Sequence, residues 1–260
     1  MFSWFSRKCD CPIPDESRAW VERRMAWVMG RFGGDRVRQA SVILPTAEYF
    51  PDDYDGSEAA GEQLFDRVCG YAGVERSRVA LRWITVDRAG PEESGRPLVV
   101  GRDGTTSGAS GTYQGGDWSH QEVITIDRRN LADPMHLVAT AAHELCHVHL
   151  LGDGRVLREE PDHEPLTDLL TVCLGLGIFG ANASFRDRAW SDARAAGWSV
   201  ARLGYLFQPT WGYALAVFAW VRGEQRPAWS KHLRPDVRAV FKSAERYLET
   251  HGVRERALLD

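Results

Sequence analysis

Apolar residues recur at every second position in part of the first half of the chain, a spacing that predicts strands. Residues 79–86 and 122–126 (EVITI) alternate in this way, and the short apolar run 41–45 (SVILP) predicts a buried strand that ends at a proline. Two amphipathic helices are also expected there, because other apolar residues recur at helical spacing. Their apolar faces consist of Trp20, Val21, Met25 and Val28, and of Leu64, Phe65, Val68, Cys69 and Ala72.

The second half of the chain shows the helical spacing throughout. A helix is predicted over residues 134–151 with Asp133 as its N-cap, and another from Glu164 to about Phe179. A third begins near Pro209 and is apolar on nearly all sides, so it should be buried. The last has an apolar face of Val237, Val240, Phe241, Ala244, Tyr247 and Leu248. Strands followed by helices favour an α+β fold, with a small mixed sheet in the N-terminal half and a helical C-terminal half.

We expect one continuous domain, because 260 residues are enough to bury a sizeable core. Residues 1–40 form an N-terminal helical segment, residues 41–185 the central core, and residues 186–260 a helical part that packs on this core. Residues 87–117 are rich in glycine and serine, which indicates loops and short, weakly defined strands.

Composition and charge exclude several classes of protein. The net charge is −4 with acidic and basic residues interspersed, so no nucleic-acid partner is expected. The N-terminal apolar run is too short for a secretory signal, and the longest apolar stretch, 169–179, is about half of a membrane span. Five cysteines at irregular spacing predict no disulfide framework, and Cys9 and Cys11 are interpreted as plain thiols. We therefore expect a cytoplasmic protein without a membrane partner.

The chemistry of the sequence is concentrated in residues 143–147, which read HELCH. On the predicted helix, His143 and His147 lie one turn apart on one face, the separation at which two imidazoles bind one zinc ion. Glu144 can reach a water at that ion without binding the metal itself, which suits a general base. The flanking residues are small and uncharged, as expected of a helix that presents a metal site to the protein interior.

A catalytic zinc site usually has three protein ligands and one open position, so a third ligand is expected. Glu164 and Asp168 lie four residues apart at the start of the next predicted helix and therefore share a face. Glu164 could bind the ion, and Asp168 could hydrogen-bond the second nitrogen of a ligand imidazole.

These two motifs resemble those of the gluzincin metallopeptidases, the thermolysin-like zincins. HELCH (143–147) matches their His-Glu-x-x-His, and EPLTD (164–168) matches their Glu-x-x-x-Asp. The match covers roughly residues 138–170, and it implies that residues 41–185 form a zincin-like catalytic core. The same motifs also look like those of uncharacterised bacterial zincin-like proteins, which supply no substrate.

The resemblance also implies a role for each site residue. One Zn²⁺ per chain is bound by His143, His147 and Glu164. Glu144 polarises the attacking water, and Asp168 supports a ligand imidazole.

The chain departs from the gluzincin pattern at three positions. His163 stands where asparagine is usual, and His149 where an apolar residue is usual. Pro165 is expected to move Glu164 to the helix cap, because a residue before proline avoids the helical conformation. We expect His149 to face solvent or join a polar network, and Cys146 to be a small core residue.

Other residues could replace Glu164 as the third ligand. Asp153 is the main alternative, because it lies six residues after His147, a spacing used by other zincins. Those zincins have a glycine three residues after the second histidine, where this chain has Leu150. The remaining candidates, close to Glu164 in sequence, are Glu160, Asp162 and His163.

Two further features concern substrate binding. Zincin peptidases bind their substrate as an added strand, and here the expected sheet edge is 109–114, where glycines allow a peptide backbone to approach. A donor to the developing oxyanion is also needed. Tyr205, Tyr213 and His232 all lie downstream, and Tyr213 is the residue we predict for this role.

The sequence thus predicts a zinc-dependent hydrolase, a metallopeptidase that acts on a peptide or protein substrate with Glu144 as general base. The alternative is a non-enzymatic binding or regulatory protein that keeps the zincin scaffold. Four protein ligands closing the site would favour this alternative. The sequence indicates neither the substrate nor an oligomeric state.

Overall fold

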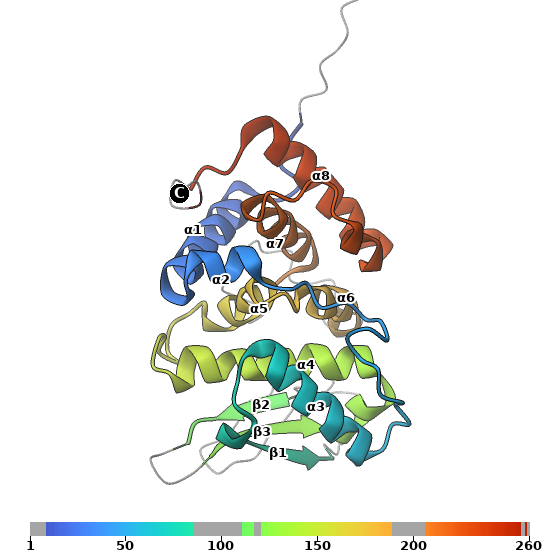
Figure 1. Ribbon diagram of the computed structural model, residues 1–260. Coiled ribbons are helices and arrows are strands. Elements are labelled where there is room, and N and C mark those ends of the chain that lie inside the picture. Colours follow the sequence, from blue (N-terminus) through green and yellow to red (C-terminus); the bar gives the residue numbers. More distant parts are fainter. Residues whose placement is uncertain (1–8, 86–110, 117–120, 189–205, 256–257, 259–260) are drawn as a thin grey trace, which may run out of the picture.

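The chain has a mostly helical α+β architecture in the computed structural model, which describes residues 9–85, 111–116, 121–188, 206–255 and 258 (Figure 1). Among these residues there are eight α-helices: α1 (Asp15–Phe32), α2 (Gly34–Gln39), α3 (Glu58–Ala72), α4 (Pro134–His147), α5 (His163–Cys173), α6 (Gly177–Arg188), α7 (Gln208–Val221) and α8 (Pro235–His251). The strands are β1 (Val79–Ile84), β2 (Gly111–Gln114) and β3 (Glu122–Asp127). The predicted α+β class with a small mixed sheet is confirmed, but the order of elements differs from the prediction, because helices α1 to α3 precede the strands and α4 to α8 follow them.

The three strands form one mixed sheet in the order β1-β3-β2. β1 runs parallel to β3, and β2 runs antiparallel to it, with Tyr113 opposite Ile124. β2 is therefore an edge strand of the described sheet. Helix α4 lies against this sheet and contacts both β2 and β3 (Figure 1).

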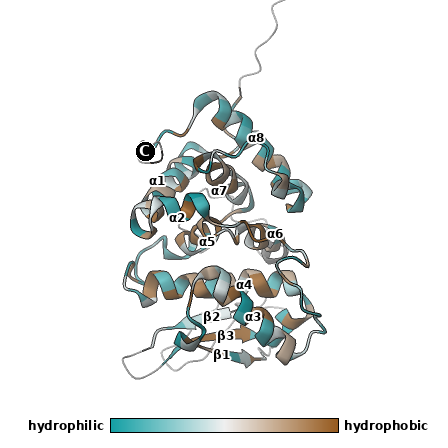
Figure 2. Cartoon of the chain, in the orientation of Figure 1, coloured by the Kyte–Doolittle hydropathy of each residue, from teal (hydrophilic) through white to brown (hydrophobic). Residues whose placement is uncertain are grey.

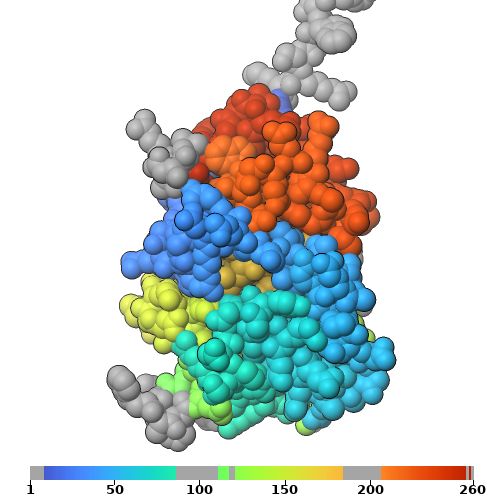
Figure 3. Space-filling model, in the orientation of Figure 1, coloured from blue at the N-terminus to red at the C-terminus, as the bar shows by residue number. Residues whose placement is uncertain are grey.

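The helices form layers above the sheet and enclose two apolar clusters. One cluster is shared by the sheet, α3, α4 and the start of α6, and the other by α1, α5, α7 and α8. Hydrophobic residues accordingly concentrate on α4, α5 and α7, in the middle of the stack (Figure 2). On one face the blue to cyan segments, from α1 to α3, cover most of the golden α5 (Figure 3). The N-terminal helix thus shares a core with the last helices of the chain.

No helix in the described parts of the chain has both the length and the apolar character needed to cross a membrane.

Two predicted elements were wrong, and both errors occur at one contact. Residues 41–45 form no strand, and the Ile43 N–H donates to the Gly175 carbonyl instead. The helix predicted from Glu164 to Phe179 is broken into α5 and α6 by a turn at Gly175, whose φ is +83°. An added Cβ at this glycine would lie 2.0 Å from the Ser41 carbonyl oxygen. The close approach of two chain segments therefore requires glycine here.

Replacing Gly175 with alanine is expected to destabilise the fold by at least about 2 kcal/mol, through the left-handed conformation and the backbone clash. The matched control is Gly70→Ala, in α3, where nothing lies within 4 Å of an added Cβ. This control should stabilise the protein by about 0.5–1 kcal/mol, because alanine has the higher helix propensity. Urea unfolding of both variants measures the difference. Equal stability of the two would contradict the assigned role of Gly175.

Candidate metal centre

Helix α4 carries the HELCH motif, and its ends follow from local sequence. The Asp133 carboxylate accepts hydrogen bonds from the backbone N–H groups of Met135 (3.1 Å) and His136 (3.3 Å), as an N-cap does. After His147 the chain continues in a short π-helical turn that ends at Gly152. The predicted helix 134–151 is therefore confirmed, with a change of winding in its last turn. Such turns are frequent next to functional sites.

Helix α5 begins earlier than its sequence suggests. It starts at His163, so Glu164 lies in the first turn rather than at the cap. Pro165 is accommodated because the N–H groups of a helix's first turn have no partner within the helix, and a missing one costs nothing. The expectation that Pro165 displaces Glu164 from the helix was wrong.

Packing of α5 on α4 brings three predicted ligands together. His143, His147 and Glu164 each offer one atom to a group in which all three atoms lie within 4.8 Å of one another. Glu164 Oε2 is 3.0 Å from His143 Nε2 and 3.4 Å from His147 Nε2. Tetrahedral ligands of a metal with bonds of about 2.1 Å stand about 3.4 Å apart. The donors therefore fit around one metal ion.

The second nitrogen of each imidazole is also held from α5. His143 Nδ1 lies 2.8 Å from Asp168 Oδ1, the contact predicted from the sequence. His147 Nδ1 lies 3.3 Å from the Thr167 hydroxyl oxygen, whose own proton is donated to the His163 carbonyl. Both Nδ1 atoms thus face acceptors, so in the neutral form of each imidazole the Nε2 lone pair is directed at the group. This is the orientation that metal-binding histidines usually have.

The electrostatics of two of the three residues match this arrangement directly. Burial lowers the pKa of His147 to about 4, so this imidazole is neutral. Burial would raise the pKa of Glu164, but hydrogen bonds to His143, His147 and His163 hold it well below its usual range. Burial also acts to lower the pKa of His143, but the bonds to Asp168 and Glu164 outweigh it and raise this pKa. His143 is therefore protonated while no metal is bound, and it releases this proton when it binds one. A carboxylate and a neutral imidazole are the forms that bind a metal.

Glu144 lies next to the three ligands and outside their group. Its side chain is buried, and burial raises its pKa to about 7. The edge strand β2 passes directly over it, because a Cβ added to Gly111 would lie 3.0 Å from Glu144 Oε1. The same added Cβ would lie 2.7 Å from Thr140 Cγ2, one turn earlier on α4. A carboxyl group with this pKa can exchange a proton near neutral pH.

The alternative ligands are engaged elsewhere. Asp153 forms ion pairs with Arg78, at 2.7 Å, and with Arg155. Asp162 accepts hydrogen bonds from Trp20 and Arg24, and Glu160 also faces Arg24.

His163 is the one alternative ligand that touches the site. Its Nε2 lies 3.1 Å from Glu164 Oε1, and its Nδ1 donates to the Glu160 carbonyl. It therefore braces the carboxylate of Glu164. His149 is buried and donates to the Ala72 carbonyl, in agreement with the predicted polar-network role, and Cys146 is a core residue as predicted.

The structure does not bring Tyr213 to this site. Its side chain is fully buried in α7, and its hydroxyl donates to Glu22 Oε1 at 2.7 Å. A phenol enclosed in this way cannot reach a substrate, so its sequence-based role in catalysis is not supported. His232 lies in a short 3-10 segment, Ala228–His232, before α8. Tyr205 lies outside the described residues, as do residues 109 and 110 of the expected edge.

Three residues at the site were not foreseen. Thr167 orients His147, as described above. Tyr113 on β2 stacks on His147 with ring centroids 5.8 Å apart, and Arg158 donates to the Tyr113 carbonyl at 3.4 Å. The sequence signal for Thr167 was a polar residue within an apolar helix, next to Asp168. No signal pointed to Tyr113 or Arg158, which reach the site only through the fold.

Comparison of the chain with protein-family models, curated proteins and solved structures gave no match. The case for a function therefore rests on the geometry of the site. Two imidazoles and a carboxylate can hold a metal ion, with a second carboxylate beside them that can exchange a proton.

Proposed function

We propose that the protein is a zinc-dependent hydrolase with a zincin-like fold, and that it cleaves peptide bonds. The observation that carries this proposal is the convergence of His143, His147 and Glu164 beside the buried Glu144. Two histidines and one glutamate are a common ligand set of catalytic zinc.

An open coordination position supports an enzyme over a structural site. Among the described residues, only three ligand atoms converge. Asp153 is held by two arginines, and His163 contacts the outer oxygen of Glu164. A structural zinc site usually has four protein ligands, which would leave no position for water. The alternative of a non-enzymatic protein would require a fourth ligand.

The chemistry follows from the residues around the metal position. Zinc in such a site lowers the pKa of water and polarises a carbonyl group. Glu144, a buried carboxylate beside the ligands, accepts a proton from the attacking water and then donates it to the departing amine. The atoms of the ligands that face away from the metal position are also held. His163 contacts the second oxygen of Glu164, Asp168 contacts Nδ1 of His143, and Thr167 contacts Nδ1 of His147.

The edge strand β2 provides a place for the substrate backbone. In the described residues it pairs with β3 on one side, and its other edge carries no partner strand. An extended peptide can add there as a further strand. Gly111 has no Cβ that would press on Glu144, so β2 and a peptide added to it can run close to this carboxylate.

The first test is the metal content of protein purified without chelator and dialysed against zinc. We expect about one zinc per chain by elemental mass spectrometry, and loss of this zinc in Glu164→Ala. The matched control is Asp153→Ala, which removes the alternative ligand and should keep the metal. If Glu164→Ala retained zinc and Asp153→Ala lost it, Asp153 would be the third ligand in place of Glu164. Absence of zinc from the wild-type protein would reject the proposal.

A further inference from the structure

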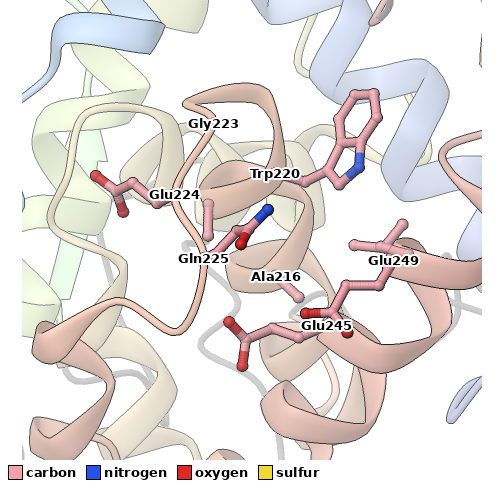
Figure 4. Close-up of a pocket in the computed structure, with 9 residues that line it drawn as sticks. Ala216, Trp220, Gly223, Glu224, Gln225, Glu245 and Glu249 are labelled. Carbon is pink, nitrogen blue, oxygen red and sulfur yellow. The ribbon is translucent and has the colours of Figure 1, made fainter.

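Two cavities in the structure differ in whether the polar side chains lining them already have hydrogen-bond partners. One, of about 460 Å³, lies between α7 and α8 and is bordered by Trp220, Glu224 and Glu245 (Figure 4). Glu224 accepts from Arg222 and Trp229, and Glu245 accepts from a backbone N–H. The third glutamate, Glu249, is exposed to solvent. Among the described residues that line this first cavity, none has a buried polar side-chain atom without a hydrogen-bond partner.

The second cavity, of about 350 Å³, lies beside the metal centre. Its wall includes Tyr113, whose ring stacks on His147, and its rim includes Leu157 and Arg158. Leu157 is 68% exposed. The volume lies in the range of small-ligand pockets and is sufficient for an amino-acid side chain.

The floor of this second cavity holds two buried oxygens without a partner. Tyr113 is 6% exposed and Glu122 is 8% exposed. In the described part of the chain, the Tyr113 hydroxyl and Glu122 Oε2 have no hydrogen-bond partner. Burial and the neighbouring Glu122 carboxylate raise the pKa of Tyr113, so its hydroxyl remains protonated. Buried polar atoms in native proteins are normally paired, and unpaired ones at a cavity wall are available to a ligand or a water molecule that enters the cavity.

Gly152 keeps this floor open. A Cβ added there would lie 2.5 Å from Glu122 Oε2 and 2.8 Å from the Tyr113 hydroxyl. The two oxygens are therefore accessible from the same point, which a side chain at this position would fill. The φ angle of Gly152 is not positive, so other residues could adopt its backbone conformation. Glycine is needed here because it leaves the space above the two oxygens empty.

The charged side chains around the floor of the second cavity disfavour the binding of a ligand group that is itself charged. Glu122 Oε1 pairs with Arg78 at 2.6 Å, and Asp153 pairs with Arg78 and Arg155, so two carboxylates face two guanidinium groups. Arg158 at the rim has no carboxylate partner among the described residues, and it disfavours a cation. Glu122 Oε2 at the floor disfavours an anion. A neutral group with two N–H donors meets both conditions.

We infer that this cavity binds one substrate side chain and selects an uncharged carboxamide, as in glutamine. Its N–H groups donate to Glu122 Oε2 and to the Tyr113 hydroxyl oxygen. The inference deepens the proposed peptidase function and rests on it. Gly111 lies at Glu144 and Tyr113 is two residues further along β2. Since a strand rises about 3.3 Å per residue, the side chain belongs to a residue one or two positions from the cleaved bond.

Binding tests the inference without requiring turnover. The protein is the zinc-loaded Glu144→Gln variant, and the probes are acetylated tetra-alanine amides with one residue replaced by glutamine, methionine, glutamate or lysine. We expect the glutamine peptide to bind at least tenfold more tightly than the other three by calorimetry. Methionine has a similar shape without the donors, so equal binding of the glutamine and methionine peptides would overturn the inference.

A substitution in the second cavity tests whether the preference for glutamine arises there. Adding Gly152→Ala to the same protein should reduce the preference for glutamine to less than twofold, while Gly70→Ala should preserve it. Zinc content of both variants shows that the metal centre is intact. A preference unchanged by Gly152→Ala would place the side chain elsewhere. If zinc binds and glutamine is preferred but the protein with Glu144 cleaves no peptide, the pocket assignment holds and the peptidase proposal fails.

Discussion

Replacing Glu144 with glutamine is expected to lower kcat for peptide hydrolysis by about 10³-fold, while zinc stays bound. Glutamine has nearly the same shape but cannot accept the proton of the attacking water. A positioned general base contributes about 10² to 10⁴ in rate. Glu144 lies outside the group of ligand atoms, and its pKa of about 7 reflects burial, so its substitution removes proton transfer and leaves the metal ligands in place.

The measurement combines kcat on a peptide library with zinc content of the same samples. Glu160→Gln serves as control, because it makes the same chemical change on the loop before α5, where Glu160 faces Arg24. The control should retain the wild-type kcat. Loss of zinc in Glu144→Gln would mean that this residue acts in metal binding, and wild-type activity would show that another group is the base.

Replacing Glu22 with alanine is expected to destabilise the protein by about 3–5 kcal/mol, because it breaks a buried ionic network. Glu22 is 1% exposed and accepts hydrogen bonds from Arg18 (3.1 Å), from Tyr213 (2.7 Å) and from the backbone N–H groups of Arg254 (2.8 Å) and Glu255 (3.1 Å). The substitution leaves these donors buried without an acceptor. It also releases the segment after α8 from α1.

Urea unfolding measures this loss, with Glu16→Ala on the same helix as control. Glu16 is exposed, so its substitution should change the free energy of unfolding by less than about 0.5 kcal/mol. Glu22→Gln keeps an acceptor oxygen and should fall between the two. Equal stability of Glu22→Ala and Glu16→Ala would show that the network contributes nothing. The zinc content of folded Glu22→Ala should be normal, because the network is separate from the metal centre.

Local patterns predicted most elements of the fold, because they depend on near neighbours in the sequence. The apolar faces in residues 20–28 and 64–72 lie on α1 and α3, and the alternating runs became β1 and β3. The same spacing could not reveal the break at Gly175. That turn exists because residues 41–45 pack against it, a contact between segments about 130 residues apart.

In the candidate site, too, local spacing predicted the residues that share one helix but not the roles that depend on the fold. His143 and His147 are placed by the pitch of a single helix, so their sequence separation fixed their geometry. The role assigned to Tyr213 had no such basis, because a tyrosine in an apolar helix shows the same pattern whether its hydroxyl faces a substrate or a buried glutamate. The structure shows the second case.

The sequence by itself determined the two ligand-bearing helices, the pairing of His143 with His147 and the pairing of Glu164 with Asp168. Each pair lies within one helix, where hydrogen bonds between near neighbours set the spacing. Only the tertiary structure decided that α5 packs on α4 in the register that brings Glu164 to both histidines. It also decided that separate segments meet around Gly152 to form a pocket. Packing and burial set such distances between segments, and no local spacing encodes them.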